Sequence, residues 1–196
     1  MADPLYLSLW FPQFGESEMM PRLLSVVRQF MFSASRPGIS ALAIHPVSWS
    51  EPTILERRFQ PGIETEEAIA VLSDMLHEDY AYALEAYWDL WILGEDGEWS
   101  VQPRPVKFIA HGLEFDEGWF QESGHIQVDF DLDTPFVFDD LDLTDASAQH
   151  VRANVQKLVS FTNAVEKNCG ISGRVLWSES EENLAQKLIA QLQKTH

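Results

Sequence analysis

Apolar residues in the first half of the chain recur with two spacings, every second residue and every three or four residues. The first spacing is typical of a strand and the second of an amphipathic helix. In chain order, the elements that this pattern predicts are a strand at 5–11, a helix at 17–36, strands at 39–47 and 53–59, a helix at 65–76 and a long strand at 80–93. This order, βαββαβ, favours a ferredoxin-like arrangement.

The second half of the chain has a different order of elements. It predicts strands at 99–115 and 125–133, a helix at 144–168, a strand at 172–177 and a last helix at 178–192. We therefore expect an α+β fold with a mostly antiparallel sheet and four main helices. Its ferredoxin-like βαββαβ N-terminal half would be continued by a strand pair and a βαβα-type C-terminal half.

The predicted elements follow one another without a linker rich in Pro, Gly or Ser, so we expect a single α+β domain over residues 1–196. Two short segments resemble each other: 38–40 and 170–172 both read Gly-Ile-Ser, follow a predicted helix and open a predicted strand. This match favours pseudo-duplicated halves, 1–97 and 98–196, although three residues also coincide by chance.

Composition favours a globular protein of a reducing compartment. The 45% of hydrophobic residues and the seven Trp are enough to fill a core. A single cysteine, Cys169, excludes an internal disulfide framework. The apolar runs are much shorter than the roughly 20 residues of a membrane span, and the first residues lack the basic segment of a secretory signal. We expect a cytoplasmic protein that does not bind membranes.

Charge is distributed unevenly along the chain. The formal net charge is −18, and between Arg58 and Arg152 there are 22 Asp and Glu residues but only two basic ones, Arg104 and Lys107. A field this negative repels the phosphates of nucleic acids and anionic lipids, so we expect neither as a partner. It would attract a basic protein.

The sharpest local pattern in the acidic stretch is a run of alternating aspartates, Asp129, Asp131 and Asp133. On a strand these carboxylates would project from one face about 6–7 Å apart. The aspartates that follow them closely are Asp139, Asp140 and Asp142. The spacing is wide for one ion, and the Gly and Glu of an EF-hand loop are missing. The six aspartates are a solvated face, which is the common case, a site for a hard cation, or the binding surface for a basic protein.

Histidines supply the alternative of a metal site. His111 and His125 could meet across the hairpin that joins 99–115 to 125–133, with Asp129 nearby. Two histidines and a carboxylate bind a metal when they converge, but this spacing does not enforce convergence. Scattered histidines of this kind more often serve packing, so we predict no metal and no cofactor.

Three aromatic residues are candidates for ligand contact. Tyr87 and Trp91 share one face of the predicted strand 80–93 with acidic residues, and Trp119 lies in an acidic loop. Aromatic faces beside carboxylates suit sugars or organic cations. They equally suit a sheet that is covered on both faces, or the interface of a homodimer.

These observations support three hypotheses about function. The sequence lacks the common motifs of nucleophilic hydrolases, phosphate loops, dinucleotide sites and Cys-pair zinc sites. We therefore favour a non-catalytic interaction module for a basic protein partner. The alternatives are a small-molecule or metal-dependent enzyme with its site near His111, His125 and Asp129, and a homo-oligomeric structural protein.

Overall fold

The computed structural model describes residues 2–137, 145–179 and 188. Seven strands in these residues form one sheet. All neighbouring strands are antiparallel, and their order is β3-β2-β4-β5-β6-β1-β7. The strands are β1 (Pro4–Trp10), β2 (Ile39–Pro46), β3 (Leu55–Ile63), β4 (Tyr80–Leu93), β5 (Trp99–His111), β6 (Ile126–Leu132) and β7 (Gly173–Ser178). The α+β class and the antiparallel sheet are thus as predicted.

Four helices accompany the sheet in the described part of the chain. They are α1 (Glu16–Val27), α2 (Thr65–Ser73), the short α3 (Phe120–Ser123) and α4 (Asp145–Asn168), with a 3₁₀ turn, η1 (Phe115–Glu117), before α3. The predicted helix 17–36 ends early, at Val27, and the last predicted helix, 178–192, lies largely outside the described residues. None of the helices described is long and apolar enough to cross a membrane.

The strand order differs from the ferredoxin-like order predicted for the first half. In a ferredoxin-like unit β1 would lie between β3 and β4, whereas here it pairs with β6 and β7. The cause is the long hairpin of β4 and β5. Its two strands pair continuously, from the Ala81–His111 pair to the Leu93–Trp99 pair. Because β5 occupies one edge of β4 and β2 the other, no edge of β4 is left for β1.

Two split βαβ units make up most of the sheet. β3 and β4 both run antiparallel to β2, which lies between them, and α2 connects them. In the same way β6 and β7 enclose β1 and are connected by α4. Because β1 belongs to the first half of the chain, the second unit combines both halves. The duplication of 1–97 and 98–196 stays a prediction.

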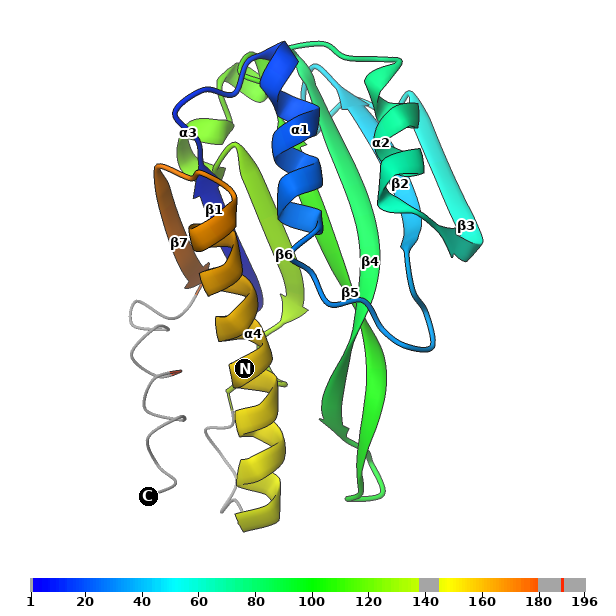
Figure 1. Ribbon diagram of the computed structural model, residues 1–196, viewed down its shortest axis with the longest axis vertical. Coiled ribbons are helices and arrows are strands. Elements are labelled where there is room, and N and C mark those ends of the chain that lie inside the picture. Colours follow the sequence, from blue (N-terminus) through cyan, green and yellow to red (C-terminus); the bar gives the residue numbers. More distant parts are fainter. Residues whose placement is uncertain (1, 138–144, 180–187, 189–196) are drawn as a thin grey trace.

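Helices α1, α2 and α4 lie on the same face of the sheet, as Figure 1 shows. Between them and the sheet lies the core, centred on the fully buried Trp88, whose ring is 5.4 Å from that of Phe130 and 5.3 Å from that of Phe30. Successive side chains of a strand point to opposite faces. Every second residue of each strand therefore projects from the other face of the sheet, which these three helices leave uncovered.

The long strand β4 extends beyond β2, whose last partner at this end is Ala86. The buried side chain of Asn154 from α4 takes the place of a neighbouring strand at this free edge. Its Oδ1 accepts a hydrogen bond from the Trp91 amide at 2.8 Å, and its Nδ2 donates to the carbonyls of Trp91 at 2.8 Å and Pro135 at 2.9 Å. One side chain thus satisfies three backbone groups.

Replacing Asn154 by alanine should lower the free energy of unfolding by about 2 kcal/mol, because buried backbone groups at Trp91 and Pro135 would lose their partners. Asn168, whose amide bonds Gln29 on the surface, provides a matched control. Asn168→Ala should change the stability by less than about 0.5 kcal/mol. Urea unfolding followed by circular dichroism measures both, and equal effects of the two variants would contradict the role assigned to Asn154.

Candidate functional site

The uncovered face of the sheet carries a row of side chains that crosses all seven strands in register. From edge to edge the row reads Arg58, Ala41, Glu85, Lys107, Asp129, Tyr6 and Trp177. Directly opposite residues on antiparallel strands bring their side chains together. Lys107 is therefore flanked by two carboxylates, and the row changes from charged residues at one end to aromatic ones at the other.

Two of the predicted partner-binding aspartates lie on this face. Asp129 is partly buried, and burial is the main cause that raises the pKa of its carboxyl group, against the opposing effects of the Asp131 amide and Lys107. Its Oδ1 accepts the Asp131 amide at 2.9 Å. Asp131 has a φ of 65° where β6 bulges against β1, and its carboxylate lies 3.7 Å from the Arg104 guanidinium.

The other predicted aspartates do not join this pair. Asp133 follows the end of β6, is only 6% exposed, and accepts a hydrogen bond from the Asp3 amide at 3.1 Å. The expectation that it shares a face with Asp129 and Asp131 is therefore wrong, because the bulge at Asp131 interrupts the alternation of the strand. Asp139, Asp140 and Asp142 lie outside the described residues.

The two predicted metal-binding histidines lie opposite each other, but each is used by the fold. The His111 amide bonds the His125 carbonyl at 2.8 Å, and the His111 Nδ1 bonds the Gly124 carbonyl at 2.9 Å. The His125 Nδ1 accepts the amide of Phe11 at 2.9 Å. Asp129 is four residues further along the strand than His125, which is about 13 Å. Among the described residues, no three His, Cys, Asp or Glu converge on a metal position.

The three predicted ligand-contact aromatics are in different places. Tyr87 is covered by the Arg36 guanidinium, 3.7 Å from its ring centre. Trp91 packs on His150 of α4 with 4.0 Å between ring centres. Only Trp119 lines a hollow of the sheet surface.

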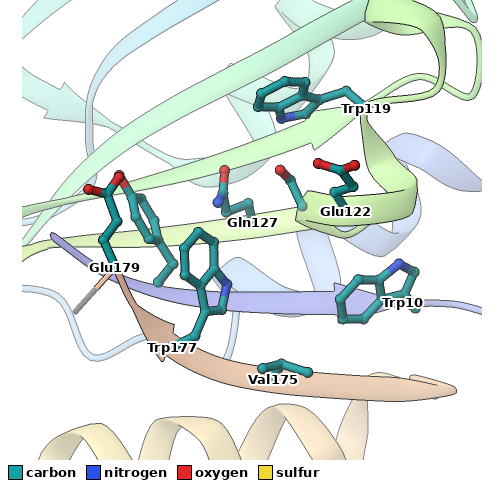
Figure 2. A pocket seen from close by; sticks show the side chains of 9 residues that line it. Trp10, Trp119, Glu122, Gln127, Val175, Trp177 and Glu179 are labelled. Carbon is teal, nitrogen blue, oxygen red and sulfur yellow. The ribbon is translucent and has the colours of Figure 1, made fainter. Parts of the chain in front are cut away.

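That hollow is a cleft of about 580 Å³ above β1, β6 and β7, which we call the aromatic cleft. Its lining consists of Tyr6, Trp10, Trp119, Glu122, Ser123, Gln127, Val175, Trp177 and Glu179. Figure 2 shows Trp119 and Glu122 on one side, Trp177 and Val175 on the other, and the Gln127 amide between them. A second hollow of about 380 Å³ lies over β2 to β6 and includes Glu56, Glu85 and Asp129.

Hydrogen bonds fix two of the three indole rings in the aromatic cleft. The Trp177 Nε1 donates to the Ser8 hydroxyl at 2.9 Å, and the Trp10 Nε1 donates to the Phe120 carbonyl at 3.0 Å. The ring of Tyr6 contacts that of Trp177, with 4.7 Å between ring centres and an angle of 35° between the ring planes. Burial, followed by the charges of Asp129 and Glu179, raises the pKa of the Tyr6 hydroxyl.

Sequence reasoning missed most of the aromatic cleft. Tyr6, Ser8 and Trp10 alternate with three leucines, which was a signal for a strand with two different faces. The pattern predicts a strand at 5–11, but it does not show that the second face of this strand lines a cleft. Glu122 and Glu179 come from segments 57 residues apart in the chain, and no local pattern connects them.

Comparison of the chain with protein-family models, with curated proteins and with solved structures finds no match in any of the three. Evidence on function therefore comes from the chemistry of the uncovered face.

The burial of His111 makes the stability of the folded protein sensitive to acid. Burial is the main cause that lowers the pKa of its imidazole to about 4, from 6.5 in an unfolded chain. Between these pH values the unfolded chain binds a proton that the folded protein does not, so stability is full above pH 6.5 and falls as the pH drops toward 4. The loss due to His111 should reach about 3 kcal/mol.

His111→Asn tests this expectation, because an amide donates to the Gly124 carbonyl but does not titrate in this range. The variant should lose less stability than the wild type in urea unfolding series between pH 7 and pH 4. All other titratable groups are common to both proteins, so equal losses would show that His111 is not the acid-sensitive group.

Proposed function

We propose that the protein is a non-catalytic binding module that engages a basic protein partner through the uncovered face of its sheet. The observation that carries this proposal is the charge of the hollows on that face. Six carboxylates line the aromatic cleft, the second hollow and a smaller hollow of about 180 Å³ at Lys107, against two cationic side chains, Arg58 and Lys107. The carboxylates are Glu56, Glu85, Glu122, Asp129, Asp131 and Glu179.

The form of the face supports the same function. The residues of the row from Arg58 to Trp177 stand on hydrogen-bonded strands, so their backbone positions are fixed before a partner arrives. Aromatic side chains supply contact area, and the excess of carboxylates attracts lysine and arginine. Complementary charge of this kind accelerates association and makes it sensitive to salt.

The remaining acidic residues would contribute to the attraction of a basic partner from a distance. Exposed carboxylates also occur on α2 and at the turn between β4 and β5, remote from the hollows. These charges raise the negative potential of the whole molecule, and the cleft and the charged row give the contact its position. The metal-dependent alternative loses support because Asp129 is remote from His111 and His125.

Charge reversal on the two sides of the sheet tests the proposal. Asp129→Lys with Asp131→Lys changes the uncovered face, and Glu67→Lys with Asp74→Lys makes the same change in charge on the exposed surface of α2. Each protein is immobilised and exposed to lysate from its source. We expect wild type and the α2 variant to retain the same basic protein, released by moderate salt, and the face variant to lose it.

Equal retention by all three proteins, or equal loss in both variants, would contradict an interface on this face. Circular dichroism must show that the face variant is folded, because Asp129 is partly buried. Light scattering, which measures the molar mass in solution, tests the homodimer alternative on the wild type. A dimer that becomes monomeric only in the face variant would assign the face to self-association instead.

A further inference from the structure

We propose that the aromatic cleft is a binding site for an organic cation, an alkylated ammonium or guanidinium group, that stacks on the tryptophans between Glu122 and Glu179. This inference goes beyond the proposed function, because the cleft would bind a small cation without any protein partner. The same chemical group occurs in free cations and in the side chains of a basic protein.

The aromatic walls are the first part of the argument. Three indoles from separate parts of the chain, Trp10, Trp119 and Trp177, line one cleft. Trp10 and Trp177 are fixed by the hydrogen bonds of their Nε1 atoms to Phe120 and Ser8, so their faces are presented in a fixed orientation. Trp119 is 39% exposed, which is unusual for the largest apolar side chain. Tryptophan is the best aromatic acceptor of a cation.

Charge is the second part. Glu122 of α3 and Glu179, directly after β7, line the cleft, and no lysine or arginine is among its lining residues. Neither carboxylate forms an ion pair with any residue of the described segments. The two carboxylates and the negative faces of the indoles therefore all favour a positive group in the same space.

Gln127 is the third and independent part. The residue is 9% exposed, its amide points into the cleft in Figure 2, and none of the hydrogen bonds between described residues involves its side chain. Its polar atoms are not among the buried side-chain atoms that lack a partner, so water in the cleft reaches them. A polar ligand in the cleft can replace this water as the partner of the amide.

A sugar is the other ligand that stacks on tryptophan, and the carboxylates decide between the two. A neutral sugar can donate hydroxyl hydrogen bonds to the two carboxylates, but it does not offset their negative charge. An organic cation neutralises this charge while its alkyl groups contact the indole faces. The cleft of about 580 Å³ is within the range of small-molecule sites.

Titration calorimetry with choline and with ethylguanidinium tests the proposal on the whole chain. The neutral control is 3,3-dimethyl-1-butanol, which has the shape of choline without its charge, and maltose represents the sugars. We expect at least one cation to bind with a dissociation constant below about 10 mM, and both neutral compounds to bind at least tenfold more weakly. We also titrate tri-arginine. If it binds more than about tenfold more tightly than ethylguanidinium, the natural source of the cation is a protein side chain.

Three variants locate the binding. Trp119→Ala should weaken cation binding about fivefold to thirtyfold, the range expected for a stacked cation. Glu122→Gln combined with Glu179→Gln should weaken it about tenfold or more, whereas the exposed Glu95→Gln at the turn between β4 and β5 should leave it unchanged. Because Trp119 and both carboxylates are exposed, these variants should fold.

Any of three results would overturn the proposal. The first is that maltose or the neutral alcohol binds as tightly as the cations. The second is that no cation shows saturable binding up to about 50 mM, and the third is that Trp119→Ala binds the cations as the wild type does. The results also separate this site from the protein interface. If Asp129→Lys with Asp131→Lys loses the basic partner but binds choline normally, the two functions are independent. Choline binding by a wild-type protein that retains no basic partner would support the cleft and contradict the proposed function.

Discussion

One-sided covering of the sheet by helices is the constraint on which the other features depend. Along each strand, alternate residues are divided between a helix-covered core and a face that α1, α2 and α4 leave uncovered. Trp88 and Phe130 thus belong to the core, while their neighbours Tyr87 and Asp129 must tolerate water. On the uncovered face this alternation places charged residues in register, because the strands are aligned by the core residues of the opposite face.

The hairpin of β4 and β5 is the frame of this arrangement. Its two strands are much longer than the others, and every remaining strand is added to one of its edges. The helices then connect strands across an intervening neighbour, which creates the two split βαβ units. The cleft lies where the second unit, built around β1, meets the short helix α3. Its ligand-facing groups therefore come from four separate segments, and the packing of both halves of the chain determines their positions.

Elements that depend on local pattern could be predicted from the sequence, and strand pairing could not. The long strand at 80–93 was predicted at its observed bounds, because its alternation continues over the whole segment. The helix predicted at 17–36 ends at Val27, and the residues after it turn toward β4, where the Ser33 amide bonds the Tyr87 carbonyl at 2.7 Å. Asp133 was placed on the wrong face because a bulge at Asp131 cannot be seen in a pattern of alternate carboxylates. The cleft could not be predicted, since the pairing of β1 with β6 and β7 joins segments more than 110 residues apart in the chain.

The free edge of β4 has a consequence for the behaviour of the protein at high concentration. Residues 87–92 read Tyr-Trp-Asp-Leu-Trp-Ile, a segment of high strand propensity with a single charge. An open edge of this composition would act as a template to which the same segment of another molecule could add. Ser33 and Lys157 bond the carbonyls of Tyr87 and Asp89, and Asn154 bonds both backbone groups of Trp91. These contacts occupy the edge at every second residue, so the packing that completes the fold also prevents growth of the sheet from one molecule into the next.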